Sequence, residues 1–181
     1  GFFDGPVDHL LAMPILTRYV RKNYGKKPLA VVSPDAGRIK VAEQWARQFD
    51  NAPLAFIHKT RDVTKANVSK ANRVVGEVEG RTCILVDDLI DTGGTICQAA
   101  EALMNDGAAE VIIVSTHAVF SGEAVNRLKD SVATEVIVTN TLPLEDDKHF
   151  DKLTVLSIAP LLAQAVSAVF EDGSVTSLFA E

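Results

Sequence analysis

The segment 83–103 combines three carboxylates with a run of threonine and glycine. Asp87, Asp88 and Asp91 lie within five positions, where like charges repel one another. The run that follows consists of Thr92, Gly93, Gly94 and Thr95. Ordering two adjacent glycines costs backbone entropy. Because both features are unfavourable by themselves, we expect a ligand to compensate for them.

The chemistry that suits these residues is recognition of a phosphorylated sugar. Glycines let successive backbone N–H groups surround a phosphate monoester at the start of a helix near Ile96, and the threonine hydroxyls add donors. The upstream acids can accept hydrogen bonds from sugar hydroxyls or hold Mg²⁺, directly or through its waters. The alternative without a ligand is a strand followed by a helix whose first turn is merely rich in Asp and Thr. Capping alone would need one such residue, and this segment has the whole set.

The elements around this segment follow an alternating order. Apolar runs rich in β-branched residues alternate with helical patterns, which is typical of a parallel sheet with helices on both faces. The predicted strands are 29–34, 54–59, 83–88, 111–117, 136–141 and a weaker one at 153–158. The predicted helices are 9–24, 38–49, 95–107, 122–131 and 157–173, the last with Gly173 as its stop signal. Residues 61–81 are polar and predict a flexible loop or a small hairpin.

Open α/β sheets bind ligands at the carboxyl ends of their strands, where five further residues of interest lie. Asp35 follows the first predicted strand and is either a helix N-cap, a metal-associated acid, or both. Arg38 could contact a phosphate or face solvent. Lys59 and Arg61 follow the second strand, and by themselves they favour a solvated surface pair. His117 ends the fourth strand, where a hydrogen-bonded structural role is the commoner one.

Composition narrows the function classes. A formal net charge of −6 at pH 7 argues against nucleic acid and anionic lipid as partners. The two cysteines have no zinc-type or disulfide spacing, which suits a reducing, cytoplasmic setting. We expect no membrane span, since no apolar run is long enough. The first residues lack a signal-peptide pattern and an initiator methionine, so we expect a fragment or a processed product.

The loop resembles the ribosyl-phosphate signature shared by phosphoribosyltransferases and ribose-phosphate pyrophosphokinases. Six motifs extend the resemblance along the chain, namely "GFFDGPVDHL", "VVSPDAG", "HKTR", "VDDLIDTGGT", "VTNT" and "LSIAPLLA". In this order and at these spacings they are similar to the C-terminal half of a ribose-phosphate pyrophosphokinase, the synthase of phosphoribosyl pyrophosphate. Details such as "AFIHKTRD" look most like actinobacterial members.

The resemblance implies a type I phosphoribosyltransferase-like α/β fold, with a mostly parallel sheet and helices on both faces. Residues 1–181 would be the C-terminal domain of a two-domain synthase whose N-terminal domain is absent from this chain. The implied reaction transfers the β,γ-diphosphate of ATP to the C1 hydroxyl of ribose 5-phosphate, which leaves AMP and requires Mg²⁺. It also implies a homo-oligomer, either a dimer or a hexamer.

The resemblance also assigns roles to residues. Lys59 and Arg61 match the basic pair of the flexible catalytic loop, and Asp35 matches a Mg²⁺-associated aspartate. Diphosphoryl transfer builds charge on phosphate oxygens, which a compact lysine and a forked arginine are suited to stabilise. The candidate residues for ribose 5-phosphate are Arg61, Asp87, Asp88, Asp91, Thr92, Gly93, Gly94 and Thr95.

Two other functions stay open at this point. A stand-alone phosphoribosyltransferase would use the same loop, but it should carry base-recognition residues that we do not identify. A non-catalytic regulatory partner of the synthase would keep the fold and lose the catalytic loop, whereas Lys59 and Arg61 are intact. The family's N-terminal half supplies much of the ATP site, so we expect catalysis only from the complete protein.

Overall fold

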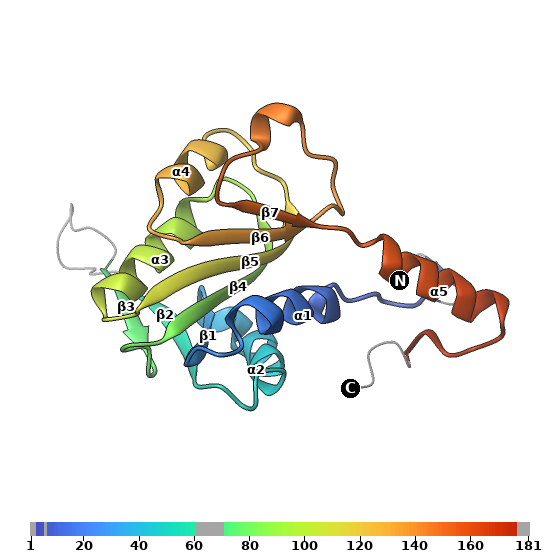
Figure 1. Ribbon diagram of the computed structural model, residues 1–181, viewed down its shortest axis with the longest axis horizontal. Helices are drawn as coiled ribbons and strands as arrows, with labels where there is room; N and C mark the ends of the chain where they lie inside the picture. The colour runs from blue at the N-terminus through green and yellow to red at the C-terminus, as the bar shows by residue number, and fades with distance from the viewer. Residues whose placement is uncertain (1–2, 6, 61–70, 177–181) are drawn as a thin grey trace.

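A single sheet organises the part of the chain that the computed structural model describes, which is residues 3–5, 7–60 and 71–176. Its strand order is β3-β2-β1-β4-β5-β6-β7 (Figure 1). The strands are β1 (Leu29–Ser33), β2 (Leu54–Thr60), β3 (Ala71–Val75), β4 (Thr82–Ile90), β5 (Glu110–Ala118), β6 (Glu135–Thr139) and β7 (Leu153–Leu156). β3 runs antiparallel to β2, and the other neighbouring pairs are parallel. The predicted mostly parallel sheet is confirmed.

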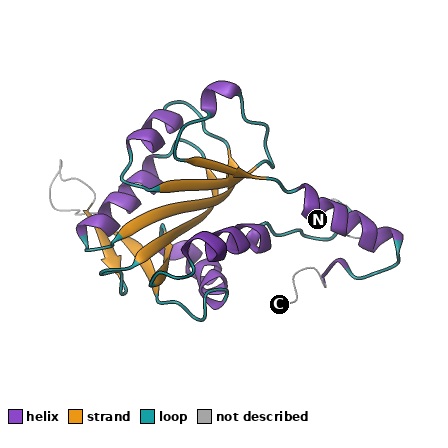
Figure 2. Ribbon diagram, viewed as in Figure 1, coloured by secondary structure: helices purple, strands orange, loops and turns teal. Residues whose placement is uncertain are grey.

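Helices cover both faces of this sheet (Figure 2). The helices on the faces are α1 (Met13–Tyr24), α2 (Ile39–Arg47), α3 (Gly94–Asn105) and α4 (Ala124–Asp130), whereas α5 (Ala159–Phe170) extends away from the sheet. Two short 3-10 turns are η1 (Ala36–Arg38) and η2 (Asp146–Lys148). Successive strand residues point to opposite faces. Cys83 and Leu85 of β4 therefore join the core on the α3 and α4 side, whereas Ile84 and Val86 join the core with α1 and α2.

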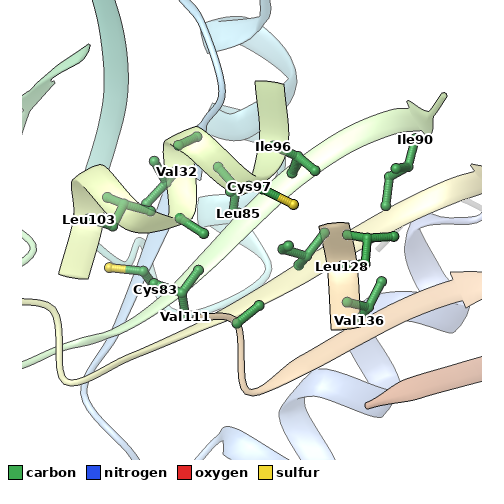
Figure 3. Packing of buried hydrophobic residues seen from close by; sticks show 14 of the residues in the cluster. Val32, Cys83, Leu85, Ile90, Ile96, Cys97, Leu103, Val111, Leu128 and Val136 are labelled. Atoms are coloured by element: carbon green, nitrogen blue, oxygen red, sulfur yellow. The ribbon is translucent and has the colours of Figure 1, made fainter. Parts of the chain in front are cut away.

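The core on the α3 and α4 side fixes the helix that follows β4 (Figure 3). Leu103 of α3 and Leu85 of β4 are both 0% exposed in this cluster, and Leu128 of α4 is as fully buried. Burying one such leucine side chain contributes about 1.5–3 kcal/mol. Because Ile96 of the first turn of α3 is buried in the same cluster, the start of α3 is held against the sheet.

Two helix boundaries differ from the prediction by three residues or more. α1 begins at Met13 and not at residue 9, because Pro14 suits the first turn of a helix and not its interior. α5 ends at Phe170, three residues before Gly173. The left-handed backbone lies at Asp172, with φ +52°, and the Gly173 N–H donates to the carbonyl of Ala168 at 2.7 Å.

The described part of the predicted loop or hairpin at 61–81 contains one strand. Residues 71–75 form β3, which pairs antiparallel with β2 from Thr60↔Ala71 to Phe56↔Val75. Residues 61–70 of that prediction lie outside the described residues.

Candidate functional site

The predicted site residues lie where the two central parallel strands end. β1 and β4 are neighbours, and their connections diverge, since α2 packs on one face of the sheet and α3 on the other. Divergent connections leave a crevice at the carboxyl edge of a sheet. Asp35 follows β1 on one side of this crevice. Asp87 and Asp88 lie near the carboxyl end of β4.

A pocket of about 410 Å³ opens at this point, and we call it the acid pocket. Its lining residues are Asp35, Arg38, Asp87, Asp88, Leu89, Ile90, Asp91, Thr92, Gly93, Gly94, Thr95 and Ile96. The structure therefore brings together Asp35, the three predicted acids of segment 83–103 and the whole Thr-Gly-Gly-Thr loop.

The loop of residues 92–95 turns directly into α3. Gly93 is the N-cap with φ +74°, a left-handed conformation that glycine adopts without a side-chain penalty. The first intrahelical bond runs from the Cys97 N–H to the carbonyl of Gly93 at 3.0 Å. The N–H groups of Gly94, Thr95 and Ile96 precede it and have no carbonyl partner within the helix. They are donors available to an anion in the pocket.

Arg38 bridges the two adjacent acids of β4. Its Nη2 donates to Oδ2 of Asp88 at 2.6 Å, and its Nε lies 3.3 Å from Oδ1 of Asp87. Oδ1 of Asp87 also accepts the backbone N–H of Asp88 at 2.9 Å. Arg38 is therefore not a free solvent-facing arginine, and because it lines the acid pocket, its contact with a ligand phosphate stays a prediction. It neutralises part of the charge of the acid pair.

The two acids respond differently to this environment. Burial raises the pKa of Asp87 from 3.8 to about 6, against the hydrogen bond from the Asp88 amide and the charge of Arg38. Burial is the largest single effect on Asp88 and acts in the same direction, but the hydrogen bond from Arg38, the interaction with Asp87, the charge of Arg38 and the Leu89 N–H together outweigh it, so the pKa of Asp88 is lowered. The Asp87 side chain is 19% exposed and that of Asp88 46%. Asp87 is therefore the acid whose ionisation is costly in the free protein.

Asp35 and Asp91 flank this pair from different loops. Oδ1 of Asp35 accepts the Gly37 N–H at 2.8 Å, so Asp35 is the N-cap of η1 and lines the pocket as well. Both sequence readings of Asp35 are thus compatible in space. Asp91 accepts a short hydrogen bond from the hydroxyl of Ser121. Its carboxylate is held at the edge of the pocket by a residue from outside it.

The sequence did not single out Ser121 or Arg127, which contact residues 91–95 from the segment after β5. Arg127 Nη1 donates to the carbonyl of Thr92 at 2.7 Å. Near the end of β5, His117 was the residue of interest in the sequence. Its Nδ1 lies 2.8 Å from the hydroxyl of Thr141. His117 is therefore hydrogen-bonded in the way expected of a structural residue, and it does not line the acid pocket.

Of the predicted basic pair, only Lys59 belongs to the described residues. Lys59 lies in β2, opposite Asn72 of β3 in the strand register. Arg61 lies outside the described residues. The catalytic roles of Lys59 and Arg61 stay predictions.

Neither a metal cluster nor a membrane span stands out in the described ranges. Within residues 3–5, 7–60 and 71–176, no group of three or more His, Cys, Asp or Glu side chains has an arrangement that could hold a metal ion. In the same part of the chain, no helix combines the length and hydropathy needed to cross a bilayer.

Comparison with known proteins identifies the family. The model of the phosphoribosyl synthetase-associated domain matches residues 43–180, which is more than half of the chain. The chain belongs to this family. A ribose-phosphate pyrophosphokinase of Bifidobacterium longum is 60% identical over 181 residues, which cover 99% of this chain and 53% of that protein. The chain spans about half the length of the curated relatives it matches.

Solved structures agree with this family assignment. The crystal structure of a phosphoribosylpyrophosphate synthetase from Mycobacterium smegmatis superposes with a TM-score of 0.87 at 57% identity, covering 95% of this chain and 55% of that one. An APRTase from Giardia lamblia superposes with a TM-score of 0.52 at 14% identity over 70% of this chain and 77% of that one, a likeness of fold alone. The phosphoribosyltransferase-like fold and the resemblance to actinobacterial synthases are thus confirmed.

Proposed function

We propose that this chain is the C-terminal domain of a two-domain ribose-phosphate pyrophosphokinase. The complete enzyme transfers the β,γ-diphosphate of ATP to the C1 hydroxyl of ribose 5-phosphate and releases AMP. In this proposal the chain supplies the ribose 5-phosphate site and the catalytic loop. The observation that carries it is the acid pocket, in which a glycine-centred helix N-terminus faces carboxylates across a single cavity.

The phosphate of the sugar binds at the Thr-Gly-Gly-Thr loop. The N–H groups at the start of α3 and the positive end of its helix dipole both favour an anion. Gly93 and Gly94 present no side chain that would keep a phosphate oxygen away from the backbone. The Thr92 and Thr95 hydroxyls line the same pocket and supply further donors.

The ribose hydroxyls bind at the acids. Ionised carboxylates are acceptors only, and a ribose ring offers donors. Asp87 benefits most, because burial already disfavours its charge and a hydroxyl donor offsets that cost. Asp88 accepts hydrogen bonds from Arg38 and from the Leu89 N–H, and Asp91 accepts one from Ser121, so the positions of both acids are set before the sugar arrives.

The residues present fit a Mg²⁺ ion of the kind that works with phosphates. Mg²⁺ is typically bound through one or two carboxylates, several waters and substrate phosphates, so it does not need a cluster of three protein acids. Asp35 uses Oδ1 to cap η1, and within the described residues its Oδ2 has no hydrogen-bond partner. When bound, the ion supplies Lewis-acid stabilisation of diphosphate charge. Asp35 would hold it, with Asp87 or Asp88 as the second acid.

Lys59 and Arg61 are the proposed catalytic residues. Negative charge that develops on the transferred diphosphate needs cations placed before the reaction begins. A lysine supplies a compact charge, and an arginine supplies a planar pair of donors for two phosphate oxygens. In this proposal Arg61 also contacts ribose 5-phosphate.

The intact synthase is proposed to be a homo-oligomer. Separately, the chain carries an apolar surface that suits packing against another domain. α5 runs away from the sheet beside the N-terminal segment (Figure 1). The two enclose a groove of about 290 Å³ lined by Leu10, Val166, Phe170 and neighbouring apolar residues. Phe170 is 85% exposed and Val166 54%. By contrast, the apolar residues of α1 are buried and complete the core.

We assign this apolar surface to the proposed N-terminal domain, since the matched relatives are about twice as long as this chain. Mixing the chain with a separately expressed N-terminal domain should give a complex on size-exclusion chromatography, and Phe170→Asp should weaken it. If Phe170→Asp left that complex intact and abolished self-association of the chain, the surface would instead join copies of this chain.

We also propose a cytoplasmic location for the protein. Cys83 and Cys97 are free thiols, and both are buried in the core. Free buried cysteines suit a reducing compartment. Tagging the full-length protein and separating the cell into fractions tests this location.

The central experiment measures AMP formation from ATP, ribose 5-phosphate and Mg²⁺. We expect activity from the two-domain protein and none from the chain alone, because much of the ATP site is assigned to the other domain. Lys59→Ala should slow the two-domain enzyme strongly, and Asp91→Asn should weaken ribose 5-phosphate binding. An unchanged rate for Lys59→Ala would contradict the catalytic-loop assignment.

A further inference from the structure

Two residues outside the acid pocket hold the backbone of its anion-binding loop. The Ser121 N–H donates to the carbonyl of Asp91 at 3.1 Å, and the Ser121 hydroxyl donates to the Asp91 carboxylate. Arg127 Nη1 donates to the carbonyl of Thr92 at 2.7 Å. Two successive carbonyls of the loop are therefore fixed toward the segment of residues 119–127, which comprises the connection after β5 and the first turn of α4.

Fixing these carbonyls also fixes the amides that the ligand would meet. In a planar trans peptide, the C=O and the following N–H point in opposite directions. With the Asp91 carbonyl turned to Ser121, the Thr92 N–H points away from Ser121. With the Thr92 carbonyl turned to Arg127, the Gly93 N–H likewise points away from segment 119–127. Residues 91–95 line the acid pocket, whereas Ser121 and Arg127 are not among its lining residues, so the side of the loop away from these two residues is the side available to a ligand in the pocket.

Segment 119–127 is itself firmly held. The Val119 and Phe120 N–H groups both donate to the carbonyl of Ile90, each at 3.1 Å. Phe120 has a left-handed backbone, with φ +48°, which is unfavourable for a bulky residue and persists only when its surroundings impose it. Its side chain is 1% exposed in the core beside α3 and α4. The segment is thus anchored by its core contacts and not by the loop that it supports.

Arg127 also brings charge to the start of α3. A Cβ built on Gly94 would lie 3.9 Å from Nη1 of Arg127, so the guanidinium is next to the first residue of the helix. Its positive charge adds to that of the helix N-terminus. Arg127 can therefore act by orienting the Thr92 carbonyl and by raising the local potential, and a lysine substitution separates the two effects.

We propose that Ser121 and Arg127 are positioning residues for the sugar phosphate: by holding the carbonyls of Asp91 and Thr92, they aim the loop amides at the phosphate. This inference rests on the proposed ribose 5-phosphate site. The two residues touch the loop and not the reacting atoms. Their removal should weaken sugar-phosphate binding without changing how ATP binds.

The test uses the two-domain enzyme and measures the KM for ribose 5-phosphate, the KM for ATP and the melting temperature. Ser121→Ala keeps the backbone N–H that holds the Asp91 carbonyl and removes only the hydroxyl that donates to the Asp91 carboxylate. Loss of this hydrogen bond to a charged group predicts a rise of about tenfold in the ribose 5-phosphate KM. Loss of an exposed but charged donor predicts about tenfold for Arg127→Met. Arg127→Lys should recover part of the loss, since a lysine keeps the charge and not the guanidinium geometry.

Lys129→Met is the matched control, because it removes one exposed positive charge from the same helix without touching the loop. It should leave both KM values unchanged. The inference is overturned if Ser121→Ala and Arg127→Met keep the wild-type KM for ribose 5-phosphate. It is equally overturned if both KM values and the melting temperature change together, which would indicate general structural damage. A wild-type enzyme that bound no ribose 5-phosphate would instead remove the proposed function and this inference with it.

Discussion

Replacing Asp87 by asparagine should stabilise the free chain at neutral pH. The folded structure raises the pKa of Asp87 from 3.8 to about 6, chiefly because the side chain is buried. One pKa unit corresponds to about 1.36 kcal/mol, so the ionised side chain costs the folded state about 3 kcal/mol. That is a large share of the roughly 5–15 kcal/mol by which domains are stable.

The sign follows from proton linkage. A carboxyl group with a raised folded pKa contributes stability that is fully present below its unfolded pKa and is lost as the pH rises through the folded pKa. The loss for Asp87 therefore falls between pH 3.8 and about 6. Asparagine imitates the protonated form, so the advantage of Asp87→Asn should be small near about pH 4 and approach about 3 kcal/mol near about pH 7.5.

Urea unfolding in metal-free buffer measures this difference. The chain has one tryptophan, Trp45, which is 6% exposed, so its fluorescence should report the loss of tertiary structure. Asp88→Asn is the matched control. The pKa of Asp88 is lowered, so its stabilisation is present above the unfolded value and lost as the pH falls, and Asp88→Asn should destabilise the chain at neutral pH. The reasoning is refuted if Asp87→Asn is no more stable than wild type at neutral pH, or if its effect is independent of pH.

Three further substitutions or treatments test the geometry. Gly93→Ala should lower the free energy of unfolding in urea by about 1 kcal/mol, because the φ of Gly93 is +74°. Gly94→Ala should leave it unchanged, because a Cβ has room at Gly94. Equal effects of the two substitutions would contradict the loop conformation. Ser115→Ala should stabilise the chain by about 1 kcal/mol, since the buried hydroxyl has no partner in the described structure; a loss of stability would reveal a partner. Cys83 and Cys97 should resist alkylation near neutral pH, because burial raises their pKa values to about 12 and about 11; rapid labelling of the folded chain, followed by mass spectrometry, would disprove this.

The sheet was predictable because its strands are buried on both faces. Segments 83–86 and 111–114 are continuous apolar runs, which are typical of strands buried on both faces of a sheet. β3 was not assigned as a strand, because Ala71–Val75 forms an edge strand with little apolar pattern of its own. Its strand character comes from pairing with β2, and pairing partners are not visible in local sequence.

The pocket was predictable for a different reason. Parallel strands deliver their carboxyl ends to one edge of a sheet, so Asp35 and the acids of β4 had to lie near one another once the strands were assigned. The contact of Arg38 with Asp88 spans 50 positions in sequence. It depends on β1 and β4 being neighbours, which no local pattern reveals. Ser121 and Arg127 escaped notice for the same reason, since they act on the backbone of a distant loop.

The acid pocket has two electrically different ends, and this explains its cost in stability. One end has acids, among which Asp87 is costly to ionise. The other end has the N-terminus of α3 with Arg127 beside it. A sugar phosphate carries donors at its hydroxyls and negative charge at its phosphate, so only one orientation satisfies both ends. Because removing the Asp87 charge would relieve the cost and remove that discrimination, a stabilised pocket should also be a less selective one.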